Sequence, residues 1–293
     1  MREKTSIADK YLLEHFYGTC FQSSKDSIRC RGVDFSDEEY SWLDVILVGE
    51  NKCGNCVHVA EKQGFYYGKG RFSSSFEKQK YVTLNNIRSQ EEFEKVCSRI
   101  NEDVRGIHVR GAVADAFPFE RYKNLEFVVL TDHRIERFWD MSKNPCLRVL
   151  TIYENKRLKS LEGLQQAENL ECIQFLTCTS SVNTAKINSL KPISNLLNLK
   201  EVILSSTEPM DHNIDYLINL PSLEYLWISP NLFPTECYAK FEAKKFMLSD
   251  EYGIYLDEGD DIFPYGKGKH IMHTQQQKQK YLKEYERLLE LYK

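Results

Sequence analysis

The chain has 293 residues and a formal net charge of −4, from 43 acidic and 39 basic residues. No segment carries the clustered positive charge that nucleic-acid recognition needs, and no apolar run is long enough for a membrane span or a secretory signal. We therefore expect neither nucleic acid nor membrane as a partner, and a cytoplasmic location. The nine cysteines are an odd number, which favours reduced thiols over a disulfide framework.

Residues 1–101 contain no internal repeat and have the mixed pattern of an α+β region. We predict strands within 42–48 and 81–84. Ser89 to Glu92 has the spacing of a helix capping box, and a helix with one apolar face follows, made by Phe93, Val96, Cys97 and Ile100. Two hypotheses remain open for this region: an N-terminal cap, or an independent functional domain.

Cys53 and Cys56 form the sharpest chemical motif in the chain. Two thiols in C-x-x-C spacing can hold a tetrahedral metal or exchange a disulfide. A zinc site needs two more ligands, and no second C-x-x-C is present. A thioredoxin-like site needs the motif between a strand and a helix, whereas residues 57–60 have the pattern of a strand. We therefore predict no metal, no cofactor and no redox site here.

Six segments with the apolar spacing L-x-x-L-x-L follow. They start at Val104, Leu125, Leu147, Leu170, Leu199 and Leu223. A motif recurring at intervals of about 20–29 residues is typical of a leucine-rich-repeat solenoid, in which each unit supplies one strand.

The most regular unit runs from Leu147 to Glu168. After its strand, Asn155 stands where the chain turns away, and Leu158, Leu161 and Leu164 follow on the returning arm. This unit resembles the short bacterial type of leucine-rich repeat, the class found in internalins. The resemblance implies an α/β solenoid of about six units over residues 102–233, with a parallel β-sheet on its concave face. It says little about activity, because such repeats serve many binding tasks.

Residues between the apolar positions should face outward, since side chains alternate along a strand. The first outward position alternates in charge from unit to unit: Arg105, Glu126, Arg148, Glu171, Lys200 and Glu224. Neighbouring parallel strands lie about 4.8 Å apart, so these charges can pair. We interpret them as a ladder that fixes register and solubility.

Further outward positions carry apolar and aromatic side chains. They predict a protein-binding face made by Phe127, Tyr153, Ile203, Tyr225 and Trp227. Large aromatic side chains bury much area at low entropic cost, and Tyr225 and Trp227 are the predicted anchors. The alternative is that flanking segments fold over part of this face.

Residues 234–293 lack the repeat and are predicted to form a C-terminal cap. A short strand is expected within 252–256, and the glycine-lysine stretch from Tyr265 to Lys269, which lacks the pattern of a phosphate-binding loop, is expected to be a surface turn. Thr274 and Gln277 form a second capping box. The helix that follows has an apolar face of Leu282, Tyr285, Leu288, Leu289 and Tyr292.

The sequence thus predicts a non-catalytic, cytoplasmic, bacterial-type interaction protein whose concave face holds another protein. One specific form of this hypothesis is an immunity protein or inhibitor that covers the active site of a toxin. The alternative is a metal- or thiol-dependent module in residues 1–101 that the repeats target to a partner.

Overall fold

The structure is a computed structural model. It describes residues 20–23, 28–30, 33–34, 46–50, 56–60, 65–68, 71–72, 81–131, 133–153, 157–176, 185–205, 207–244, 255–256 and 262–293. The predicted charge ladder and binding-face residues all lie within these ranges, whereas Cys53 and Asn155 lie outside them.

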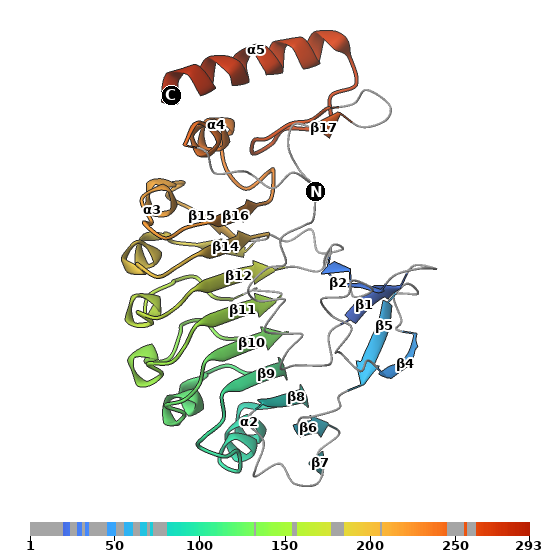
Figure 1. Cartoon of the computed structure of the whole chain (residues 1–293), viewed down its shortest axis with the longest axis vertical. Helices are drawn as coiled ribbons and strands as arrows, with labels where there is room; N and C mark the ends of the chain where they lie inside the picture. The colour runs from blue at the N-terminus through green and yellow to red at the C-terminus, as the bar shows by residue number, and fades with distance from the viewer. Residues whose placement is uncertain are drawn as a thin grey trace.

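Each of the six repeat segments forms one strand of a parallel sheet (Figure 1). The strands are β9 (Gly106–Gly111), β10 (Phe127–Thr131), β11 (Val149–Tyr153), β12 (Cys172–Leu176), β14 (Glu201–Leu204) and β16 (Tyr225–Ile228). Equivalent apolar positions lie side by side, as when Val128 pairs with Leu150 and Leu150 with Ile173. The predicted leucine-rich-repeat solenoid with its parallel sheet is therefore confirmed.

The repeat sheet continues in the N-terminal direction beyond residue 102. Strand β8 (Tyr81–Ile87) pairs in parallel with β9, and β6 (Phe65–Gly68) pairs in parallel with β8. Strand β7 (Arg71–Phe72) is antiparallel to β6 and completes a sheet that has nine strands within the described residues. The last part of the predicted N-terminal region thus forms the first turns of the solenoid.

Helix α2 (Gln90–Cys97) follows β8 and closes the first turn. The Ser89 hydroxyl accepts a hydrogen bond from the backbone N–H of Glu92 at 3.1 Å, which confirms the predicted cap. Phe93, Val96 and Ile100 are each at most 2% exposed, so the predicted apolar face is the buried one.

Short helical turns return the chain in the later repeats and lie together on one side of the sheet (Figure 1). They are the 3-10 helices Phe117–Arg121, Met141–Lys143, Leu164–Gln166 and Lys191–Asn195, and α3 (Asp215–Ile218). Strands β13 (Ala185–Ile187) and β15 (Thr207–Pro209) form a small parallel pair next to these turns in the chain. Leucine side chains of the strands and turns, such as Leu150 and Leu164, are fully buried between them. Burial of each such side chain contributes about 1.5–3 kcal/mol.

A buried asparagine joins two consecutive turns, a feature that the repeat pattern does not predict. Asn144 donates to the carbonyl oxygens of Phe119 at 2.8 Å and Tyr122 at 2.9 Å, and its own oxygen accepts from the Trp139 indole N–H at 2.6 Å. Each of these two carbonyl oxygens also accepts a backbone N–H, from Tyr122 and Leu125 respectively, so Asn144 adds a second hydrogen bond to each and satisfies its own buried amide.

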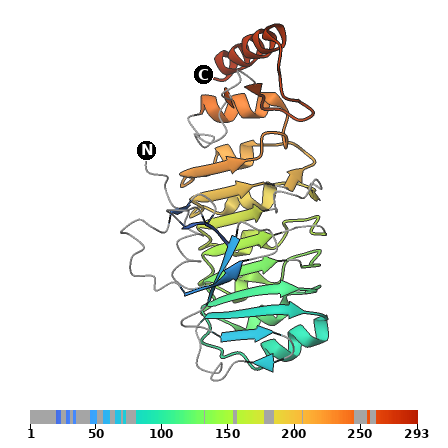
Figure 2. The same cartoon turned by 90° about the vertical axis from the view of Figure 1, so that its right-hand side faces the viewer.

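A second, antiparallel sheet of five strands is described in the N-terminal region. Its strands are β1 (Cys20–Ser23), β2 (Ile28–Cys30), β3 (Val33–Asp34), β4 (Ile46–Glu50) and β5 (Cys56–Ala60). Strand β5 confirms the strand predicted for residues 57–60, and its antiparallel neighbours β1 and β4 differ from the βαβ setting of a thioredoxin motif. Both views place this sheet on the side of the repeat sheet away from the helical turns (Figures 1 and 2).

The C-terminal residues form the predicted cap, with one helix that the sequence analysis missed. That helix is α4 (Thr235–Ala243), and it is followed by β17 (Tyr255–Leu256), β18 (Ile262–Phe263) and α5 (Gln275–Tyr292). The Thr274 and Gln277 capping box is present, and α5 packs on α4. The hydroxyl of Tyr285 donates to the Glu242 carboxylate at 2.7 Å across this contact.

The glycine-lysine stretch is docked against the last repeat, so the prediction of a surface turn is wrong for its first half. Tyr265 is 2% exposed and stacks on Tyr238 with ring centroids 4.9 Å apart. The backbone N–H of Gly266 donates to Pro230 at 2.8 Å, and a Cβ on this glycine would lie 2.1 Å from the Thr235 hydroxyl oxygen. Lys267 forms an ion pair with the buried Glu208.

Candidate protein-binding face

The repeat sheet has an inner face, which packs on the solenoid core, and an outer face, which corresponds to the concave face of the sequence prediction. Strand register places the outer residues in two rows that run across the strands from β9 to β16. The first outer row is Gly106, Phe127, Val149, Cys172, Glu201 and Tyr225. The second outer row is His108, Val129, Thr151, Gln174, Ile203 and Trp227. These two rows contain four of the five predicted binding residues.

The central part of the outer face is buried. Phe127, Val129, Val149 and Thr151 are 0% exposed, although they point away from the solenoid core. The prediction that Phe127 is an exposed binding residue is therefore wrong, and the alternative of a folded-over flank holds for this part of the face. The sheet β1–β5 lies on this side of the repeat sheet (Figure 2).

One sequence signal for this burial was available in strand β10. The strand has an unbroken apolar run, made by Phe127, Val128, Val129 and Leu130. A strand with one solvent-exposed face alternates apolar and polar residues instead. Such a run is typical of a strand that is covered on both faces.

The middle of the buried area is polar. The Gln174 side-chain amide donates to the Glu201 carboxylate at 2.7 Å, and the Cys172 thiol lies 3.3 Å from the same oxygen. The Thr151 hydroxyl donates to the Gln174 amide oxygen at 3.3 Å. Glu201 is only 3% exposed. This network satisfies polar groups that would be costly to bury alone.

The other predicted residues are partly exposed and mostly gather at the C-terminal repeats. Ile203 and Trp227 are direct neighbours in register, and Tyr225 lies on the same strand and face as Trp227. All three are partly exposed. Tyr153 is also partly exposed but stands on β11, three strands and about 14 Å away from β16. The structure thus brings three of the five residues together.

The charge ladder stands one residue before the strands, and three of its neighbouring pairs form ion pairs. Arg105 contacts Glu126 at 2.7 Å, and Glu171 contacts Arg148 at 2.6 Å and Lys200 at 3.0 Å. Partial burial by itself would raise the pKa of Glu171. Hydrogen bonds from Arg148 and Lys200 outweigh it and hold this pKa below its ordinary value.

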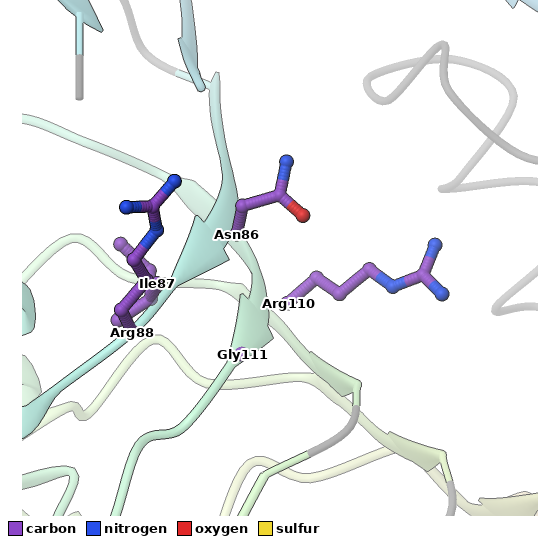
Figure 3. A pocket seen from close by; sticks show the side chains of 5 residues that line it. All are labelled: Asn86, Ile87, Arg88, Arg110 and Gly111. Atoms are coloured by element: carbon purple, nitrogen blue, oxygen red, sulfur yellow. The ribbon is translucent and has the colours of Figure 1, made fainter. Parts of the chain in front are cut away.

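Two open pockets lie away from the outer rows. One, of about 510 Å³, is at the ends of β8 and β9; Asn86 and Arg110 extend to one side there and Arg88 to the other (Figure 3). The other, of about 400 Å³, is lined by the ladder residues Arg148, Glu171 and Lys200. Because the arginines of the first pocket diverge and the charges of the second are paired, neither has the convergent groups of a catalytic site.

The described residues contain no group of three or more His, Cys, Asp or Glu side chains placed to hold a metal ion. Cys56 begins β5, while Cys53 lies outside the described residues, so the absence of a metal at this pair stays a prediction. Among the helices of the described part of the chain, none has the length and apolarity to cross a membrane.

No family model matches the chain. The disease resistance protein RPS4B of Arabidopsis thaliana is 27% identical over 197 residues; the match covers 57% of this chain and 16% of that protein. The chain therefore spans about a sixth of the length of this relative.

Two solved bacterial structures are also similar. One is a leucine-rich-repeat protein of Leptospira interrogans, with a TM-score of 0.45, 17% identity and coverage of 56% of this chain and 41% of that one. The other is an internalin of Listeria monocytogenes, with a TM-score of 0.36, 14% identity and coverage of 55% and 51%.

Proposed function

We propose that this leucine-rich-repeat solenoid binds a partner protein on the outer face of its C-terminal repeats and catalyses no reaction. The observation that carries the proposal is the cluster of Ile203, Tyr225 and Trp227, which are partly exposed on two adjacent strands of a rigid sheet. Aromatic side chains on a preformed surface are typical hot spots, because they bury a large area with few rotatable bonds.

The surroundings of this cluster suit a protein surface as partner. Lys200 and Glu224 precede the two strands, and their charged groups supply a polar rim on one side of the apolar cluster. An apolar centre with a charged rim is the usual composition of a protein-protein interface.

The more specific form of the proposal is an inhibitor or immunity protein that acts in the bacterial cytoplasm by covering the active site of its target. The rigid repeat surface and the odd number of cysteines support it.

The test is affinity capture of a partner with the immobilised full chain, followed by titration calorimetry with the captured protein. The double variant Tyr225→Ala, Trp227→Ala should weaken binding by more than about tenfold while the unfolding midpoint changes little. Leu197→Ala is the matched control, because Leu197 is a 62% exposed apolar residue beside a helical turn. Unchanged binding by the double variant, or equal loss with Leu197→Ala, would contradict the proposal.

A further inference from the structure

In the middle of the repeat sheet both faces are buried, but they differ in composition. On the inner face, Val128, Leu150 and Ile173 belong to the continuous apolar core. Their outer neighbours Val149 and Cys172 are just as buried, yet among the described residues they are not part of that core. The outer face is therefore buried by a separate contact, made on the side where the sheet β1–β5 lies (Figures 1 and 2).

Uncovering the outer face costs less than opening the core. Beside the apolar Phe127, Val129 and Val149, its buried area contains Thr151, Gln174 and Glu201, whose polar groups regain hydration when water enters. The equivalent inner positions carry only apolar side chains, which gain nothing from water. A cover over polar groups is thus held less strongly than the solenoid is held to itself.

The β1–β5 sheet, which we call the cover, also has its own backbone hydrogen bonds. The five strands β1–β5 pair with one another in a separate sheet, and the nine strands of the repeat sheet pair among themselves. No strand ladder joins the two sheets within the described residues. The β1–β5 sheet can therefore move away without breaking a ladder of either sheet.

We propose that the β1–β5 sheet is an intramolecular occupant of the outer face, and that it opens as a unit while the solenoid stays folded. The part of the proposal that concerns a partner rests on the function proposed above: the partner competes with this sheet for the face and gains Phe127 and Val149 when the sheet leaves. In the closed form, the partly exposed C-terminal cluster of Ile203, Tyr225 and Trp227 is open to a first contact.

Three cysteines of the native chain report on this opening. Cys146 is exposed, Cys172 is buried on the outer face, and Cys97 is buried in the solenoid core. The full chain is alkylated with iodoacetamide, and the rate at each cysteine is followed by mass spectrometry of its peptide. Dividing the rate in denaturant by the native rate gives a protection factor, which cancels differences in intrinsic thiol reactivity.

We expect almost no protection at Cys146, the strongest at Cys97, and protection at Cys172 that is at least about tenfold weaker than at Cys97. Equal protection at Cys172 and Cys97 would overturn the proposal, because the outer face would then open only when the solenoid unfolds. An absence of protection at Cys172 would also overturn it, because the face would not be covered in solution. The measurement needs no partner, so its failure leaves the binding test at Tyr225 and Trp227 unaffected.

Discussion

Glu171 is the residue on which the charge ladder depends most, because it pairs with cations on both neighbouring strands. Replacing Glu171 with Lys would place three cations side by side and should lower the free energy of unfolding by about 1 kcal/mol. Replacing it with Gln removes the attraction without adding repulsion, and should lower the free energy of unfolding by only a few tenths of a kcal/mol. Denaturant midpoints in low and high salt check this, since salt should reduce the difference between the variants. Equal midpoints in low salt would show that the ladder is incidental.

The same carboxylate predicts a pH dependence. The pKa of Glu171 is lower in the folded chain than in the unfolded chain. Its carboxylate therefore contributes fully to the free energy of unfolding above the unfolded pKa of about 4.3, and this contribution is lost as the pH falls through the folded pKa. The stability difference between the native chain and Glu171→Gln should therefore be constant from pH 7 to about pH 5 and shrink below about pH 4. A difference that grows on acidification would contradict the ion pairs.

Among the elements, the two helices with a Ser or Thr N-cap were predictable and α4 was not. Ser89 and Thr274 predict the starts of α2 and α5 because their hydroxyls can cap a helix N-terminus, and the structure has both caps. Helix α4 begins after Pro234 without a side-chain cap, and it is held by packing of Tyr238 and Phe241 that only the folded chain supplies. The repeat period likewise predicted the six strands β9, β10, β11, β12, β14 and β16 but not β13 or β15. The bonds of Asn144 join turns from different repeats and leave no periodic signal.

Helix α5 provides a matched pair of side chains for testing how the cap is held. Tyr285 is 1% exposed and faces α4, while Leu291 on the same helix is 64% exposed. Tyr285→Ala should destabilise the chain by roughly 3 kcal/mol, because it leaves a large cavity under α5, whereas Leu291→Ala should change the stability by less than about 0.5 kcal/mol. Thermal unfolding of both variants distinguishes them. Similar melting temperatures for the two would mean that α5 does not pack on α4 in solution.

For the molecule as a whole, the sequence predicted which side chains enter the solenoid core but not which part of the outer face is covered. Strand alternation identifies the inner residues because it is a local rule. The cover over Phe127 and Val149 is made elsewhere in the chain, and no period relates the two. Apolar residues that point outward can bind a partner protein or be covered by a flanking segment of the same chain. In the structure both cases occur, because Phe127 is covered while Tyr225 and Trp227 are partly exposed.

Two adjacent valines of β10 can test whether the inner and outer faces of the repeat sheet open together or separately. Val128 and Val129 are both 0% exposed, but Val128 faces the core and Val129 the cover. Val128→Ala should lower the free energy of unfolding of the solenoid by roughly 2 kcal/mol, seen as weaker hydrogen-exchange protection across β9 to β16. Val129→Ala removes the same atoms from the contact with the cover, so it should leave that protection nearly unchanged and raise the alkylation rate of Cys172. If both variants weaken strand protection equally, the two faces belong to one cooperative core, and the N-terminal sheet unfolds only together with the repeats.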